Sequence, residues 1–170
     1  MNIQLGRTKI VRRAYGIDEI ALVPGRRTVD PGITKTNWEI GGIERDIPII
    51  ASAMDGVVDV NMAVALSKLG ALGVLNLEGV QTRYEDPKEV LNKIQSIGKE
   101  EFVPLMQEIY NKPIKEKLIL KRIQEIKDSG GIAAVSGTPL AAIKYKNLVK
   151  DSGADLFFLQ ATVVSTEHLG

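Results

Sequence analysis

Short apolar runs alternate along the chain with longer stretches in which apolar residues recur every three or four positions. Four of the short runs have no polar residues in alternation and are bounded by Gly, Pro or Asp, which is typical of parallel strands covered on both faces. These runs predict strands at residues 47–53, 71–76, 131–136 and 154–160.

The stretches between these strands have the apolar spacing of amphipathic helices. They predict helices at residues 61–69, 87–97, 114–127 and 140–150, and a less regular helix at 99–110. Asp59 is expected to cap the first of these helices, and Thr138 followed by Pro139 is expected to begin the last one. Residues 38–43 predict a small hairpin, because Gly41-Gly42 suits a tight turn.

The alternation of strands with helices predicts an α/β fold with a parallel sheet and right-handed crossovers. Two architectures fit this order. One is an open doubly wound sheet, and the other is a (β/α)₈ TIM barrel, which needs roughly 200 to 250 residues when complete. The chain has 170 residues and ends soon after the fourth predicted strand. We therefore expect it to hold only about the first four βα units of such a barrel.

Composition limits the classes of function. The chain is 44% hydrophobic and 25% charged with a formal net charge of +1, so no global field recruits nucleic acid or an acidic membrane. It contains no cysteine and one histidine, His168, which argues against disulfides, a cysteine nucleophile and a metal site. The sequence has no apolar run of about 20 residues and no apolar signal-peptide core. We expect a cytoplasmic protein without nucleic-acid or membrane partners.

Polar residues follow the predicted strands, at the carboxyl ends where ligands bind in both architectures. After the first strand, the Ser52 hydroxyl could hydrogen-bond a ligand and Met54 could pack against a planar ring. The competing interpretation is an ordinary turn, which we also expect to be the role of Asp55. After the fourth strand, Gln160 needs hydrogen-bond partners, since a buried unpaired amide costs about 1–3 kcal/mol. His168 is a weaker candidate, because a lone histidine is more often a surface or packing residue.

Four segments together resemble the IMP dehydrogenase/GMP reductase family, and more narrowly its IMP-dehydrogenase-related branch, which lacks the CBS regulatory module. The segments are DEIALVPGRRTVDP (18–31), IPIIASAMDGVVD (47–59), AVALSKLGALGVLN (63–76) and GADLFFLQATVVSTEHL (153–169). The resemblance runs from about residue 12 to the end and is weakest over residues 99–130. The first two segments in tandem are specific, whereas either one alone is not.

The resemblance implies that residues 1–170 are the N-terminal half of a single TIM-barrel domain. It implies NAD(P)-linked interconversion of IMP and GMP in guanine nucleotide metabolism, with a homo-oligomer, a tetramer in the family, when full length. Ser52 and Met54 map to residues that touch the purine nucleotide, IMP or GMP. Gln160, Ala161 and Thr162 map to the segment that faces the nicotinamide cofactor, NAD or NADP.

Departures from the family pattern bear on activity. IMP dehydrogenases usually carry an aspartate where this chain has Gln160, and a histidine-containing turn where it has residues 76–78. The family's nucleophilic cysteine, phosphate-binding loops and general base come from the second half of the barrel. The 170-residue chain alone is therefore expected to be inactive. The absent regulatory module and Gln160 favour the GMP reductase direction, while the branch name favours IMP oxidation.

Two other hypotheses stay open from the sequence. One is a non-catalytic nucleotide-binding or assembly module, which should be a stable monomer. A half-barrel fragment would instead leave its first and fourth strands as unpaired edges, which promote association. The other is a different (β/α)₈ enzyme that binds a phosphorylated ligand, and it requires Ser52 and Met54 to be buried.

Overall fold

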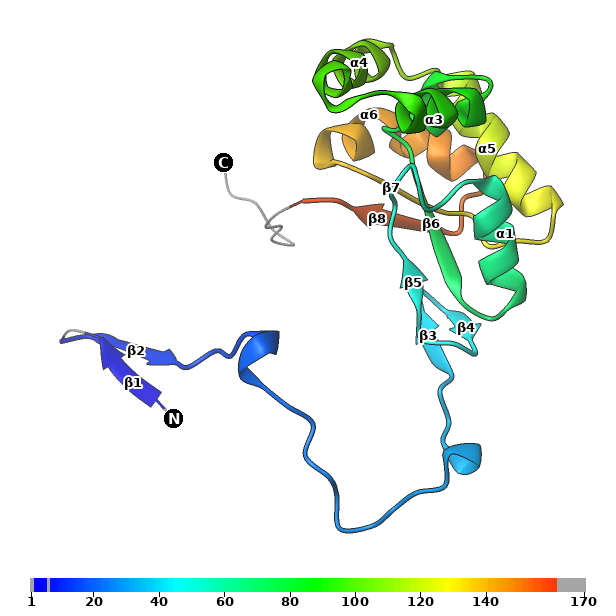
Figure 1. Ribbon diagram of the computed structural model, residues 1–170. Helices are drawn as coiled ribbons and strands as arrows, with labels where there is room; N and C mark the ends of the chain where they lie inside the picture. Colours follow the sequence, from blue (N-terminus) through cyan, green and yellow to red (C-terminus); the bar gives the residue numbers. More distant parts are fainter. Residues whose placement is uncertain (1, 6, 162–170) are drawn as a thin grey trace. The chain divides into compact units, whose positions relative to one another are not determined.

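The computed structural model describes residues 2–5 and 7–161 (Figure 1). Contacts within the chain divide it into two compact units, Met1–Lys35 and Thr36–Gly170. The first unit contains an antiparallel hairpin of β1 (Asn2–Leu5) and β2 (Lys9–Arg12), which the sequence analysis did not predict. Two single 3₁₀ turns follow it, at Ile17–Glu19 and Pro31–Ile33. None of the residues of this unit whose side chains are described is buried.

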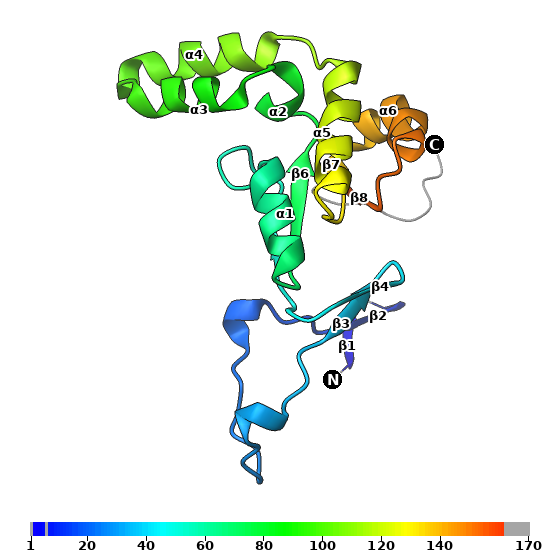
Figure 2. The ribbon, with the colours of Figure 1, turned by 90° about the vertical axis from the view of Figure 1, so that its right-hand side faces the viewer.

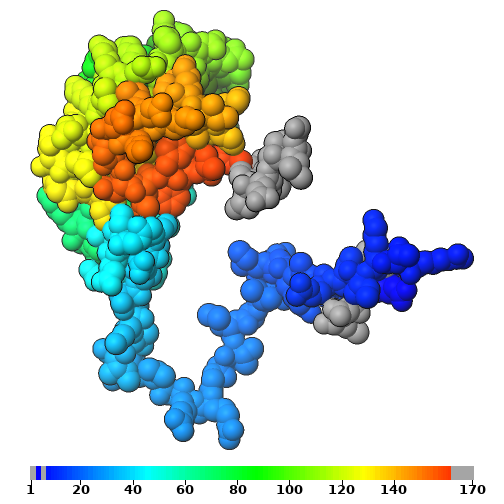
Figure 3. Space-filling view, turned by 180° about the vertical axis from the view of Figure 1, so that it is seen from behind, coloured from blue at the N-terminus to red at the C-terminus, as the bar shows by residue number. Residues whose placement is uncertain are grey.

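A four-stranded parallel sheet forms the centre of the second unit. Its strands are β5 (Ile50–Ala51), β6 (Leu72–Asn76), β7 (Ala134–Gly137) and β8 (Leu156–Leu159), in the order β5-β6-β7-β8. All three neighbouring pairs are parallel. The predicted parallel sheet is therefore confirmed, and Figure 3 shows β8 at the surface of this unit.

The first strand is shorter than the predicted range of residues 47–53, for a local reason. The Ile49 N–H donates to the Ile47 carbonyl at 2.8 Å, and the Met54 N–H donates to the Ser52 carbonyl at 2.8 Å. Each of these bonds turns the chain back on itself within three residues. Only Ile50 and Ala51 lie between the two turns, and they pair with β6.

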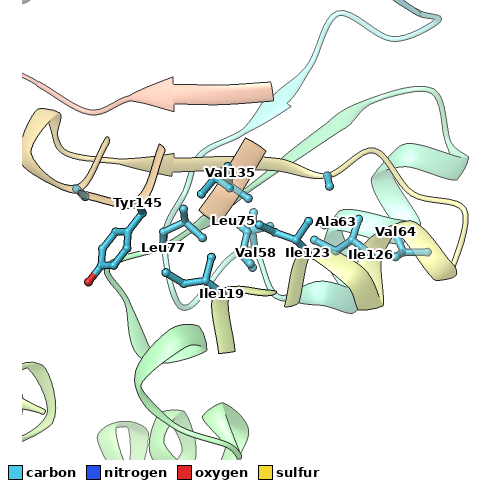
Figure 4. Packing of buried hydrophobic residues seen from close by; sticks show 13 residues of the cluster. Val58, Ala63, Val64, Leu75, Leu77, Ile119, Ile123, Ile126, Val135 and Tyr145 are labelled. Atoms are coloured by element: carbon cyan, nitrogen blue, oxygen red, sulfur yellow. The ribbon is translucent and has the colours of Figure 1, made fainter. Parts of the chain in front are cut away.

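Three helices cover one face of the sheet. They are α1 (Val60–Lys68), α5 (Glu116–Asp128) and α6 (Pro139–Asp151). Apolar residues from all three pack with Leu75 and Val135 of the sheet in one buried cluster (Figure 4). A doubly wound sheet carries helices on both faces, so this one-sided arrangement favours the barrel.

The two helix caps predicted in this layer are confirmed. The Asp59 carboxylate accepts a hydrogen bond from the Met62 N–H at 2.7 Å at the start of α1. The Thr138 hydroxyl accepts from the Ala141 N–H at 3.3 Å, and Pro139 is the first residue of α6. Gly70 has φ +86° after α1, a conformation that other residues rarely adopt.

A helical segment separates β6 from α5. It contains α2 (Val80–Arg83), α3 (Pro87–Ser96) and α4 (Lys99–Asn111), and Figures 1 and 2 show α3 and α4 side by side. The sequence predicts α3 and α4 but not α2, because four residues are too few to show helical periodicity. The segment has a small core of its own around Val80, Leu105 and Ile109.

The other face of the sheet is apolar near the amino-terminal ends of its strands. Leu72, Val74 and Ala134 are buried there, and Ile40 packs against them. Ile40 belongs to the predicted hairpin, which is observed as β3 (Trp38–Ile40) and β4 (Ile43–Arg45) with positive φ at both turn glycines.

Candidate functional site

The residues that follow β5 and β8 meet at the carboxyl edge of the sheet. The Gln160 side-chain amide donates to the Ala53 carbonyl at 3.5 Å, although the two residues are 107 positions apart. Ser52, Met54 and Gln160 are all exposed. We call these three residues the carboxyl-end shelf. Thr162, the fourth predicted site residue, and His168 lie outside the described residues.

Local hydrogen bonds turn Met54 outward. Its carbonyl accepts from the N–H groups of Val57 and Val58, both at 2.9 Å. Val58 is fully buried in the cluster beneath the helices, whereas the Met54 side chain is 57% exposed. The loop is thus anchored by Val58 and presents the thioether to solvent. The interpretation that required Ser52 and Met54 to be buried is therefore wrong.

Polar groups line the sheet face on which the shelf lies. Asn76 pairs in register with Ser136. This pair lies two residues further along the strands than the apolar pair of Val74 and Ala134, and therefore on the same face. The Ser136 hydroxyl is buried and, within the described part of the chain, has no hydrogen-bond partner. Leu156 and Phe158 pack on this same face, and strand alternation assigns Gln160 to it as well.

The Glu78 carboxylate forms hydrogen bonds within the fold at this edge. Its carboxylate accepts from the Thr138 N–H at 2.6 Å and from the Thr138 hydroxyl at 3.2 Å. A carboxylate at the amino terminus of a helix is favourable, because the helix dipole is positive there. Glu78 therefore joins the end of β6 to the start of α6. The sequence analysis did not identify this role, since the two residues are 60 positions apart.

The Asp55 carboxylate also forms hydrogen bonds within the fold. One carboxylate oxygen, Oδ2, accepts from the Tyr110 hydroxyl at 2.5 Å and from the Val80 N–H at 3.1 Å. Burial, followed by the hydrogen bond from Tyr110 to Asp55, raises the pKa of the Tyr110 hydroxyl above its ordinary value, so the hydroxyl stays protonated and donates. The expectation that Asp55 would fix the local turn differs from this geometry, because its carboxylate bonds to residues 25 and 55 positions away. The sequence analysis did not identify Tyr110 as its partner.

Two open hollows lie elsewhere in the second unit. A hollow of about 680 Å³ lies among α1, α2, α3 and α5, and one of about 300 Å³ lies between α6 and β8. Ser52, Met54 and Gln160 line neither hollow. Neither hollow therefore belongs to the carboxyl-end shelf.

Metal binding and membrane insertion are two further possibilities for the described residues. Among them, no three His, Asp or Glu side chains are grouped so that they could hold a metal ion. No helix within the same residues is both long enough and apolar enough to cross a membrane. At the carboxyl edge, the Ser52 hydroxyl and the Gln160 amide are exposed neutral groups that a ligand can reach.

Comparison with known proteins gives consistent matches. Residues 14–167 match the sequence profile described as the IMP dehydrogenase / GMP reductase domain. A crystal structure of an IMP dehydrogenase/GMP reductase-like protein from Corynebacterium glutamicum is similar with a TM-score of 0.84 at 30% identity, covering 99% of this chain and 46% of that one.

Sequence relatives agree with this. An uncharacterized oxidoreductase from Mycobacterium leprae is 32% identical over 170 residues, which is 97% of this chain and 45% of the relative. An inosine-5'-monophosphate dehydrogenase from Methanocaldococcus jannaschii is 32% identical over 102 residues, or 60% of this chain and 19% of the relative. The chain thus spans less than half the length of these relatives. The predicted fold class, about four βα units of a (β/α)₈ barrel, is confirmed.

Proposed function

Because the chain belongs to the IMP dehydrogenase/GMP reductase family, we propose that it supplies the carboxyl-end shelf of an NAD(P)-linked purine nucleotide oxidoreductase. In this proposal residues 1–170 are the N-terminal half of one barrel domain without a CBS module. The complete enzyme either oxidises IMP with NAD(P)⁺ or reductively deaminates GMP to IMP with NAD(P)H, and it acts in the cytoplasm as a homo-oligomer. Ser52 hydrogen-bonds the nucleotide, Met54 packs on its base, and Gln160 with Thr162 flanks the nicotinamide.

One observation carries the proposal. The Met54 thioether is 57% exposed at the same edge where the Gln160 amide reaches the Ala53 carbonyl. A polarizable apolar side chain beside neutral hydrogen-bonding groups is suited to a flat, polar ring system. The shelf is therefore able to hold a purine and a nicotinamide in register.

The residues of this chain are suited to binding a nicotinamide and orienting it. Gln160 offers an amide that can donate and accept hydrogen bonds. When bound, a nicotinamide supplies hydride transfer to or from the purine. This chain's own residues orient the two rings and hold them together, which lowers the entropic cost of the reaction. Asp55 and Glu78 already accept hydrogen bonds within the fold, so we assign them no proton transfer.

Methionine-methyl NMR tests the nucleotide-binding role. In the ¹³C-methyl-methionine-labelled chain, adding IMP or GMP is expected to shift the Met54 methyl resonance, because a purine ring stacked on it changes its magnetic environment. Met54→Ala is expected to weaken binding by at least about tenfold, since burying a methionine side chain contributes about 1.5–3 kcal/mol. Met62→Ala is the matched control, because Met62 is also partly exposed but lies on α1. A Met54 resonance that does not move at saturating nucleotide would contradict the proposal.

The 170-residue chain by itself is expected to show no turnover. Covalent catalysis needs an activated nucleophile, and the chain has no cysteine. The measurement follows the absorbance of reduced nicotinamide with IMP and NAD(P)⁺, and with GMP and NAD(P)H. The Methanocaldococcus jannaschii enzyme serves as the positive control. A rate near that of the control would overturn this expectation.

The GMP reductase direction is the alternative within the same family. It is supported by Gln160, which stands where IMP dehydrogenases usually carry an aspartate. The same pair of assays on a full-length protein that carries this segment separates the two directions, because reduced nicotinamide accumulates in one and disappears in the other.

A non-catalytic nucleotide-binding or assembly module is the alternative from another class. It is favoured by the missing nucleophile. It shares the Met54 binding test with the main proposal, but it also requires a monodisperse chain. In the described sheet β5 and β8 each have one neighbour, and such free edges promote association.

A further inference from the structure

We propose that a latch between the loop after β5 and helix α4 positions Met54 for the nucleotide base. The latch consists of the Asp55 carboxylate, the Tyr110 hydroxyl and the backbone at Gly79 and Val80. Tyr110 and Gly79 act as positioning residues in this assignment, since neither lies on the carboxyl-end shelf. The inference rests on the proposed function, because it assigns the means by which the shelf is held in shape.

The contacts of Asp55 join three separate parts of the chain. Asp55 follows Met54 directly in the loop after β5. Its Oδ2 atom accepts from Tyr110 on α4, 55 positions away, at 2.5 Å and from the Val80 N–H at the start of α2 at 3.1 Å. Hydrogen bonds to a charged acceptor are roughly twice as strong as neutral ones. The loop is thus tied to the helical segment between β6 and α5 at the residue next to the proposed base contact.

Gly79 lets the carboxylate approach closely. A Cβ atom at Gly79 would overlap the Asp55 carboxylate, and the three atoms nearest to that Cβ all belong to Asp55. Gly79 has φ −94°, a value open to any residue, so the close approach is the reason for glycine here. The Oδ1 atom of Asp55 is buried against this backbone and has no hydrogen-bond partner within the described residues. Hydrogen bonds therefore hold the Oδ2 atom, and the backbone at Gly79 confines the Oδ1 atom.

The latch controls the direction of Met54 more than the stability of the main core. The Met54 side chain is mostly exposed, so packing does not fix its orientation. Its backbone neighbours do, through Val58 on one side and Asp55 on the other. Neither Asp55 nor Tyr110 belongs to the cluster that packs the helices on the sheet. Releasing Asp55 should therefore reorient Met54 while the fold persists.

The first test removes one hydrogen bond. Tyr110→Phe in the methyl-labelled 170-residue chain is expected to shift the Met54 resonance before any nucleotide is added. It is also expected to weaken IMP binding by at least about fivefold, the lower end of usual coupling between sites. The matched control is Tyr84→Phe, which removes the bond from a neighbouring tyrosine hydroxyl to the Ile109 carbonyl. That control should leave the Met54 resonance in place.

The second test pushes the carboxylate away. Gly79→Ala is expected to shift the Met54 resonance and to weaken IMP binding by at least the same factor. Gly98→Ala is its control, because both glycines are helix N-caps with extended backbone, but a Cβ at Gly98 meets no atom within 4 Å. Asp55→Ala together with Gly79→Ala should relieve the overlap, so the double variant should be more stable than Gly79→Ala alone.

The outcomes separate the latch from the proposed function. If Tyr110→Phe leaves the Met54 resonance of the folded chain unchanged, the latch is wrong, even if nucleotide binds. If the resonance shifts but the unaltered chain binds no nucleotide, the latch holds Met54 and the proposed function is wrong. If Gly79→Ala does not fold, Tyr110→Phe still decides the question.

Discussion

Replacing Ile123 by alanine is expected to lower the free energy of unfolding by about 2–5 kcal/mol. Ile123 is fully buried on α5, in the cluster that packs the helices against the sheet (Figure 4). The substitution removes apolar atoms from contact and leaves a cavity, because a close-packed interior relaxes only in part. An effect of this size is a large fraction of the stability of an ordinary domain.

Urea unfolding followed by circular dichroism measures the effect. The matched control is Ile143→Ala, the same substitution on α6, where the side chain is 69% exposed. The control is expected to change the free energy of unfolding by no more than about 0.5 kcal/mol. Equal losses for the two variants would show that Ile123 does not lie in the core.

The second large effect is expected for Arg122→Met, a loss of about 1–3 kcal/mol, because the substitution orphans the buried Gln81 carbonyl and an orphaned buried acceptor costs about that much. The Arg122 side chain is buried and donates to the carbonyls of Gln81 at 3.0 Å and Glu85 at 2.8 Å, and to the Glu125 carboxylate at 3.0 Å. Methionine keeps most of the apolar stem but donates no hydrogen bond. The variant should therefore loosen the connection between α2 and α5.

Lys121→Met is the control for this variant. Lys121 precedes Arg122 on the same helix and lies 3.9 Å from Glu85 and 4.0 Å from Glu125, but its side chain is half exposed. Exposed ion pairs of this kind contribute about 0–1 kcal/mol. If thermal or urea unfolding shows the same loss for both lysine and arginine variants, the buried carbonyl contacts of Arg122 do not stabilise the fold.

Much of the sheet and helix pattern could be predicted because short segments of the sequence are enough to indicate it. Apolar runs bounded by turn residues identified the four parallel strands, and periodicity identified all the longer helices. Asp59 and Thr138 correctly predicted the starts of two helices. The element that was missed in the second unit, α2, is only four residues long.

The candidate site was predictable in part for a topological reason. Parallel strands deliver their carboxyl ends to one edge, so Ser52, Met54 and Gln160 could be assigned to that edge before any coordinates were known. Their binding roles remain predictions. The sequence did not indicate that Gln160 reaches back to Ala53, because that contact depends on the curvature of the sheet.

The sequence by itself determined the order of the four parallel strands and the longer helices, the caps at Asp59 and Thr138, and the family to which the chain belongs. Only the tertiary structure decided which polar side chains form hydrogen bonds within the fold and which remain available to a ligand. Asp55 is held by Tyr110 and Glu78 by Thr138, across 55 and 60 positions. Such contacts depend on how whole helices pack on a sheet, whereas a sequence window reports only on residues a few positions apart.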